Sequence, residues 1–177
     1  AGGLSALDKW ADLPVELLAP PSLFEEISTR YGNFENINHV PITPLHPHKT
    51  GDLNVTAFEV YAGTGEDGRE SYGYRFETGK RTVTYVSDFK DLPEGSERFL
   101  TDNELLIVDG GGWDRDLPTH RGVLNRLPSY ADANNAMVLF TGIGRSAPPH
   151  AQASTAVKRV CHRADVAYDF MKIPLGR

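Results

Sequence analysis

The segment Arg81 to Asp88, with the sequence RTVTYVSD, most constrains what this chain can fold into. Its β-branched and aromatic residues alternate between two faces, which is typical of a β-strand. Asp88 ends this strand and so places a carboxylate at its carboxyl end. Such an acid can hold a metal ion, act as a base, or only cap the next turn. The choice depends on which other polar residues share that end of the sheet.

The rest of the chain alternates between strand and helix patterns. A strand is predicted at Leu53 to Tyr61, and Tyr72 to Glu77 with Thr82 to Val86 predicts a hairpin around Thr78 to Lys80. Residues 34–52, rich in Pro and His, predict an irregular connection. The other predicted elements are helices at Leu4 to Leu13, Ser22 to Tyr31 (with Ser22 as N-cap), Pro93 to Leu100, His120 to Leu127 and Ala151 to His162, and strands at Val15 to Ala19, Leu105 to Val108, Met137 to Thr141, Val166 to Tyr168 and Met171 to Leu175.

Paired strands early and α/β alternation late predict an α/β fold, a mixed sheet packed by helices. The 177 residues suffice for one domain with a core, and no linker indicates a second, so residues 1–177 are expected to form a single domain.

The net charge of −6 gives no basic footprint for nucleic acid or an anionic membrane. Cys161 is the single cysteine, which excludes an internal disulfide and a multi-cysteine metal site. With no apolar run long enough for a bilayer and no signal-peptide pattern, a cytoplasmic protein is expected.

Polar candidates follow several of the apolar runs. They are Asp88, Asp109 after LLIV, His120 after the loop Gly110 to Gly112, and Gly142 after LFT. Ends of strands are where α/β folds place their sites. Each candidate also has a structural alternative: Asp88 as the cap of a turn, His120 as a helix start, and Asp109 as a hydrogen-bond acceptor for the glycine loop.

Six segments follow one another in the order in which a known superfamily carries its motifs. They are AGGLSAL, VTAFEVYAG with YGYRFET, TYVSD, LLIVDGGG with THRG, FTGIG, and VAYDFMKIPL. Together they resemble the metallo-β-lactamase superfamily, and most closely its cyclic-phosphodiesterase branch linked to phosphonate breakdown. The resemblance covers nearly all of the chain. It implies an αββα sandwich with mixed sheets and a site at one edge.

The resemblance also implies a chemistry, in which two divalent ions such as zinc or manganese activate a water for attack on an ester or phosphodiester of a small-molecule substrate. On this comparison Asp88 matches the metal-bridging carboxylate and His120 the catalytic histidine. Ala62 and Gly142 stand where the family has metal-binding histidines, and the family's H-x-H-x-D-H motif would lie before Ala1. One metal ligand therefore remains, and no dinuclear centre is expected in these residues.

The same comparison implies that the first strands of the sandwich are missing, so that the chain is the C-terminal portion of the fold. An apolar sheet face would then be exposed, and we expect a trimmed product, a homo-oligomer or a partner segment that covers it.

Two functions stay open. One is a metal-dependent hydrolase of phosphodiesters or related esters. The other is a metal-free pseudoenzyme or small-molecule binding protein, because the accessory B proteins of pyrroloquinoline-quinone biosynthesis share the fold and vary its ligands.

Overall fold

The computed structural model describes residues 2–62, 69–79, 81–117, 120, 122–133 and 137–175. Its helices are α1 (Gly2–Trp10), α2 (Pro21–Tyr31), α3 (Val123–Ala133), α4 (His150–Val160) and a 3-10 helix, η2 (Glu97–Leu100). Its strands are β1 (Val15–Ala19), β2 (Ile37–Pro41), β3 (His48–Thr50), β4 (Leu53–Ala62), β5 (Arg69–Thr78), β6 (Arg81–Val86), β7 (Leu105–Asp109), β8 (Met137–Thr141) and β9 (Ala164–Val166). In the described part of the chain no helix has both the length and the apolar character needed to cross a bilayer.

The strands form two sheets of unequal size. β1 and β2 make a parallel pair, and the other strands make one sheet in the order β3-β4-β5-β6-β7-β8-β9. Within this large sheet, neighbours from β3 to β6 are antiparallel and neighbours from β6 to β9 are parallel. The segment RTVTYVSD supplies β6, the strand at which the pairing changes. The predicted α/β class with a mixed sheet is therefore confirmed.

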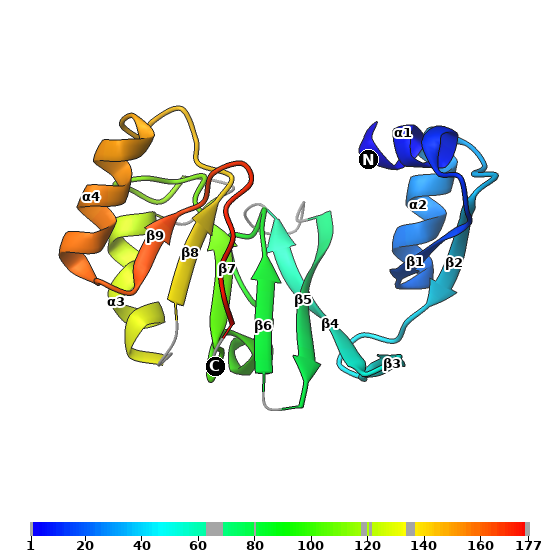
Figure 1. Cartoon of the computed structure of the whole chain (residues 1–177), viewed down its shortest axis with the longest axis horizontal. Helices are drawn as coiled ribbons and strands as arrows, with labels where there is room; N and C mark the ends of the chain where they lie inside the picture. Colours follow the sequence, from blue (N-terminus) through cyan, green and yellow to red (C-terminus); the bar gives the residue numbers. More distant parts are fainter. Residues whose placement is uncertain are drawn as a thin grey trace.

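One face of the large sheet carries the core. The rings of Phe58 and Phe140 and the side chain of Leu106 have no exposed surface, and they belong to one cluster with η2, α3 and α4. Helix α4 packs on β9, and α3 packs on β8 and α4. Figure 1 shows these two helices gathered at the β9 end of the sheet. The sheet thus presents a rigid base at the carboxyl ends of its parallel strands.

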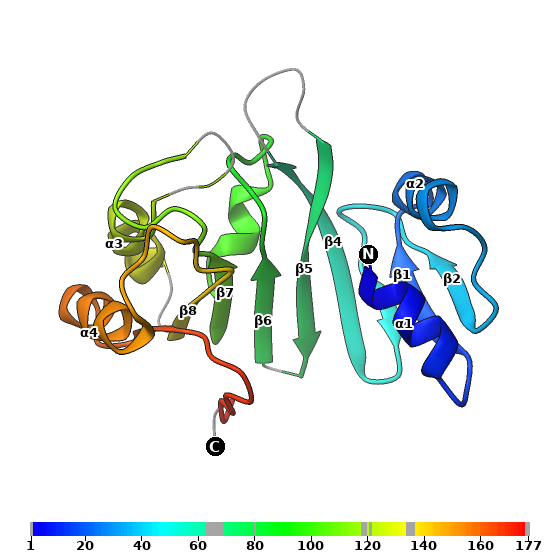
Figure 2. The ribbon, with the colours of Figure 1, turned by 90° about the horizontal axis from the view of Figure 1, so that it is seen from above.

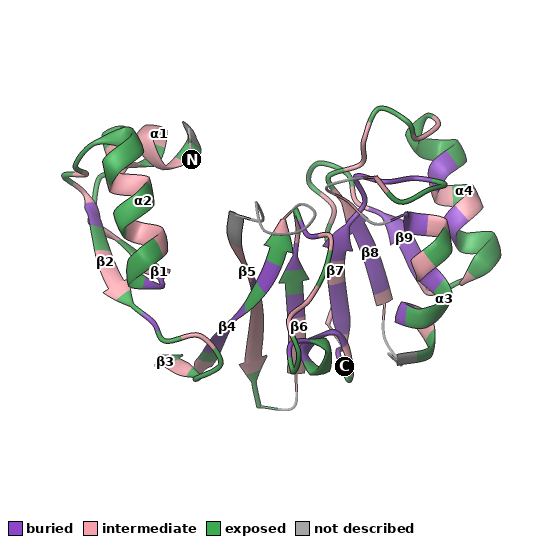
Figure 3. Cartoon of the chain, turned by 180° about the vertical axis from the view of Figure 1, so that it is seen from behind, coloured by how far each residue is buried: buried purple, intermediate pink, exposed green. Residues whose placement is uncertain are grey.

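The remaining elements form an N-terminal unit of α1, β1, α2 and β2, which lies beyond β4 and β3 at the other end of the molecule (Figures 1 and 2). Within it, the Phe24 ring of α2 stacks on His39 of β2 with centroids 4.1 Å apart, and His39 Nε2 lies 2.9 Å from the carbonyl oxygen of Ala19 in β1. No residue of α2 is buried, and Trp10 of α1 is 81% exposed. Figure 3 shows the contrast, with buried residues concentrated in the large sheet.

Several predictions for the first half need correction. The first helix ends at Trp10 instead of Leu13. Helix α2 starts with Pro20 as its N-cap instead of Ser22, because a proline at the first helical position needs no N–H partner. The connection predicted at residues 34–52 contains β2, which pairs with β1 far earlier in the chain, and β3, which forms a tight antiparallel hairpin with β4. The predicted hairpin is confirmed by the β5–β6 pairing, although Lys80 in its turn lies outside the described residues.

The second half also departs from prediction at element ends. Only Glu97–Leu100 of the helix predicted at Pro93 to Leu100 is helical, and it is a 3-10 helix. The helix predicted at His120 to Leu127 is α3, which begins at Val123 because the N–H groups of Val123 and Leu124 donate to loop carbonyls. The last strand is Ala164–Val166 instead of Val166 to Tyr168. Residues 171–175 are not a strand, since a turn at Phe170, with φ of +65°, interrupts the extended run.

Candidate functional site

Asp88 follows β6 in a left-handed backbone conformation, with φ of +52°, which is rare for a residue other than glycine. Backbone hydrogen bonds hold the turn after it: the Lys90 N–H donates to the Tyr61 carbonyl at 2.7 Å, and the Tyr61 N–H donates to the Asp91 carbonyl at 2.9 Å. The buried Phe89 ring anchors the same turn in the core. These contacts hold Asp88 in its strained backbone conformation and leave its side chain exposed. Strained conformations of this kind are common at functional sites.

Asp109 ends β7, and its carboxylate is only 2% exposed. Its Oδ1 accepts a hydrogen bond from the Gly111 N–H at 3.3 Å, so the predicted contact with the glycine loop is confirmed. Its Oδ2 accepts a second one from His120 Nδ1 at 3.0 Å. The His120 ring lies directly over Gly111, where an added Cβ would be 2.5 Å from His120 Cγ. Residue 111 must therefore be glycine for the ring to reach Asp109.

The electrostatic balance at Asp109 is unfavourable to its charge. Burial raises the pKa of the Asp109 carboxyl, and the nearby Asp88 carboxylate acts in the same direction. The His120 ring and the Gly111 N–H oppose this effect without cancelling it. A buried carboxylate whose charged form is disfavoured in this way is stabilised by a nearby proton donor or cation.

Asp88, Asp109 and His120 form a cluster at the carboxyl ends of β6 and β7. Each offers one ligand atom, and these atoms all lie within 4.8 Å of one another. The two strands are parallel neighbours, so residues that follow them meet at the same edge of the sheet. No other group of three His, Cys, Asp or Glu side chains with this spacing occurs among the described residues. The structure thus brings together Asp88 and His120, the two site residues predicted from the sequence, and Asp109, which the sequence predicted as an acceptor for the glycine loop.

Two further positions expected from the family comparison carry no ligand. Ala62 ends β4, next to Tyr61 and its backbone bridge to Asp91. Gly142 follows β8 with φ of +64°, and a Cβ built there would lie 3.6 Å from Asp109 Oδ1. A side chain at position 142 would therefore begin beside the cluster. Two carboxylates and an imidazole suit one zinc or manganese ion, but the described residues do not supply the ligands of two.

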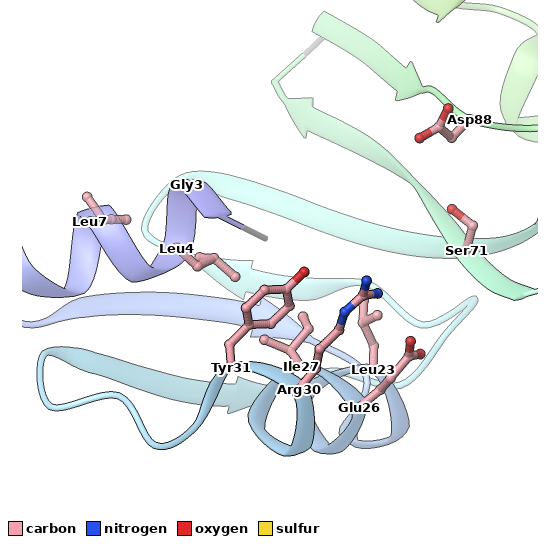
Figure 4. Close-up of a pocket in the computed structure, with 10 residues that line it drawn as sticks. All are labelled: Gly3, Leu4, Leu7, Leu23, Glu26, Ile27, Arg30, Tyr31, Ser71 and Asp88. Atoms are coloured by element: carbon pink, nitrogen blue, oxygen red, sulfur yellow. The ribbon is translucent and has the colours of Figure 1, made fainter.

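A cavity of about 730 Å³ lies beside Asp88, between the large sheet and the N-terminal unit. This volume is suited to a small molecule. Figure 4 shows side chains of α1 and α2 on one side of it, with Asp88 and Ser71 on the other. The helices contribute both aliphatic and charged side chains, and the lining comprises Gly3, Leu4, Leu7, Leu23, Glu26, Ile27, Arg30, Tyr31, Ser71 and Asp88.

Comparison with known proteins supports the same architecture. Residues 2–165 match the family described as the beta-lactamase superfamily domain. A search of curated proteins finds no significant match. Among solved structures, a diphosphatase from the PhnP family is 21% identical with a TM-score of 0.70, covering 97% of this chain and 64% of its own. The zinc-bound PqqB of Methylobacterium extorquens is 17% identical with a TM-score of 0.75, covering 97% and 69%.

The short form of human tRNase Z is similar as well, at 15% identity and a TM-score of 0.66, covering 99% of this chain and 73% of its own. At these identities the similarity shows a shared fold. The chain spans 64% of the length of the diphosphatase, which is less than two thirds.

Proposed function

The chain belongs to the metallo-β-lactamase superfamily, and on this premise we propose that it is a metal-dependent hydrolase of phosphodiesters or related esters. The observation that carries the proposal is the convergence of Asp88, Asp109 and His120, with ligand atoms within 4.8 Å of one another, at one sheet edge. Structural neighbours that are named as a diphosphatase and a tRNase support hydrolysis as the reaction type.

We assign the metal to the carboxylates of Asp88 and Asp109, whose ligand atoms lie within 4.8 Å of each other, with Asp88 as the member exposed beside the cavity. A bound zinc or manganese ion would supply an acidified water and charge stabilisation on the ester oxygen. The cavity beside Asp88 would hold the rest of a small substrate, with its apolar part against the aliphatic side chains of α1 and α2.

We assign proton transfer to His120. The Asp109 carboxylate accepts the hydrogen on Nδ1, which fixes the tautomer and the orientation of the ring. Nε2 is then the ring atom that can accept the proton released by the attacking water and, in the imidazolium form, pass it to the leaving oxygen of an ester. The imidazole is 25% exposed whereas the Asp109 carboxylate is 2% exposed, so His120 is the more accessible of the two to substrate and Asp109 orients it.

Hydrolysis of an activated aryl phosphodiester by the purified protein, with zinc or manganese added, tests this proposal. His120→Ala is expected to lower kcat by about 10²–10⁴-fold, the usual contribution of a general acid. His46→Ala is the matched control, because His46 is exposed in a turn and contacts the Pro44 carbonyl. Equal rates for wild type and His120→Ala would contradict the assignment.

Ala62 and Gly142 favour a second candidate, a metal-free pseudoenzyme or small-molecule binding protein that keeps the fold. In that case the cavity beside Asp88 would bind a ligand without reaction. Metal analysis of the purified protein separates the two candidates. One or more tightly bound ions per chain would support the hydrolase, and a stoichiometry near zero after incubation with zinc and manganese would support the binding protein.

A further inference from the structure

One side chain, that of Lys90, joins the two loops that carry the cluster. Lys90 lies two residues after Asp88, and its backbone N–H is bound to the Tyr61 carbonyl of β4 at 2.7 Å. Its Nζ donates to the main-chain carbonyl of His120 at 3.3 Å and pairs with Asp116 Oδ2 at 3.5 Å. Lys90 is thus fixed to the sheet at its backbone and to the His120 loop at its tip.

Asp116 receives this ammonium group on a loop that is itself closed. Asp116 Oδ1 accepts a hydrogen bond from the Gly122 N–H at 2.7 Å, and the Arg126 guanidinium lies 3.5 Å from Oδ2. The Gly122 N–H lowers the pKa of the Asp116 carboxyl; burial acts against this, and Lys90 and Arg126 add to the lowering. The carboxylate is therefore charged at neutral pH and available to Lys90.

The contact of Lys90 with His120 differs from an ordinary surface ion pair. The Lys90 side chain is only 19% exposed, and its Nζ contacts the backbone of the residue that bears the reactive ring. The Leu117 N–H donates to the same His120 carbonyl at 2.9 Å, so this oxygen is held from two sides. Asp109 holds the ring, whereas Lys90 holds the backbone from which the ring projects.

We propose that Lys90, with Asp116 as its counter-ion, is a positioning residue that sets the separation between the Asp88 carboxylate and the His120 imidazole. Its importance for catalysis rests on the proposed function, but the positioning is a property of the fold and needs no metal. Loss of the ammonium group releases the His120 loop from the Asp88 turn. A displacement of the reacting groups by about 1 Å lowers a rate by about 10²-fold, and this loss is expected in kcat with KM nearly unchanged.

The direct test is the state of the His120 ring in protein labelled with ¹⁵N at its six histidines. The signals of His120 are identified by their loss in His120→Asn. In the wild type, one tautomer with hydrogen on Nδ1 is expected, because Nδ1 donates to Asp109. In Lys90→Met, which keeps the aliphatic stem, this single-tautomer pattern is expected to be lost through averaging of the two ring nitrogens. Lys90→Arg, which keeps a cationic donor, is expected to restore it.

Lys158→Met is the matched control, since it also removes one lysine from an ion pair, with Asp165 at 2.7 Å on α4 and β9. It should leave the His120 signals unchanged. A thermal melt shows whether Lys90→Met is folded; if it is not, Asp116→Asn breaks the same pair while keeping an acceptor for Gly122. An unchanged His120 pattern in the folded variant would overturn the proposal.

The same samples separate this proposal from the proposed function. A changed His120 pattern in Lys90→Met supports positioning by Lys90, even where the wild type hydrolyses no ester and the function proposed above fails. An unchanged pattern, together with hydrolysis that depends on His120, overturns positioning by Lys90 and leaves the hydrolase intact.

Discussion

The N-terminal unit and the seven-stranded sheet both combine parallel strands with packed helices, the sheet adding antiparallel strands at its β3 end, but only the sheet has a substantial core. In the sheet, Phe58, Leu106 and Phe140 have no exposed surface, whereas no residue of α2 is buried and Trp10 of α1 is 81% exposed. Asp88, Asp109 and His120 all follow strands of the sheet, and the N-terminal unit contributes only walls of the cavity. The comparison indicates that the precise side-chain geometry lies on the stable part of the molecule.

The largest expected effect comes from core truncation in the two regions. Phe140→Ala, in β8, should lower the free energy of unfolding by about 3–5 kcal/mol, because it removes a buried ring from a close-packed cluster. Leu23→Ala, in α2, should lower it by less than about 1 kcal/mol, because Leu23 is only half-buried. Urea denaturation measures both values. Equal losses would mean that the N-terminal unit is packed as firmly as the sheet.

Two glycine-to-alanine variants, one beside the site and one in α1, compare how closely the two regions are packed. Gly111→Ala should destabilise the fold by about 1–3 kcal/mol, because the new Cβ would lie 2.5 Å from His120 Cγ. Gly3→Ala, in α1, has no atom within 4 Å of its Cβ and should stabilise by about 0.5–1 kcal/mol through helix propensity. Thermal unfolding followed by circular dichroism measures both. If Gly111→Ala were as stable as the wild type, the close approach of the His120 ring would be wrong.

A smaller effect on the free energy of unfolding comes from the titration of Asp109 in the sheet. Because the pKa of Asp109 is raised, mainly by burial, its contribution to stability is fully present below about pH 4 and is lost as the pH rises through the folded-state pKa. Asp109→Asn removes this titration. The free energy of unfolding of wild type relative to Asp109→Asn should therefore fall as the pH rises above about 4, with a slope of at most about 1.4 kcal/mol per pH unit, until the folded-state carboxyl is ionised.

Asp165 provides a control of opposite sign for that experiment. Burial raises its pKa, but hydrogen bonds from Lys158, Ser154 and the Val166 N–H outweigh it, so that the net pKa is lowered. Its stabilising contribution is present above about pH 4 and is lost as the pH falls through the folded-state pKa. Urea denaturation across pH should show the two Asp→Asn variants diverging from wild type in opposite directions. Parallel curves would contradict the environment assigned to Asp109.

The parts of the fold that the sequence predicts well have local signals. The bounds of β1 and β8 match the predicted strands at Val15 to Ala19 and Met137 to Thr141, because short, mostly apolar runs mark strands without reference to their partners. β2 and β3 were missed in residues 34–52, because their Pro and His content is typical of a loop. β3 is a short strand in a tight hairpin with β4, whereas β2 is a strand only through its long-range pairing with β1. Tertiary pairing overrode local preference.

The site also has parts with a local sequence signal and parts that depend on long-range contacts. Asp88 and His120 could be proposed from their positions after apolar runs and from the family resemblance, and their roles stay predictions. The links from Lys90 to His120 and Asp116 span 30 and 26 residues, and no local pattern indicates them. The predictions of a single domain over residues 1–177, of missing first strands and of a covering partner also stay predictions.

The central claim is that the Asp88 cluster is a metal site, and calorimetric titration of zinc into the metal-free protein tests it most directly. The wild type should bind at least one ion per chain, and Asp88→Asn should bind it about 10–100-fold more weakly or not at all. Asp52→Asn, an exposed acid in the turn before β4, is the control and should bind like the wild type. No binding by the wild type, or equal binding by Asp88→Asn, would contradict the claim.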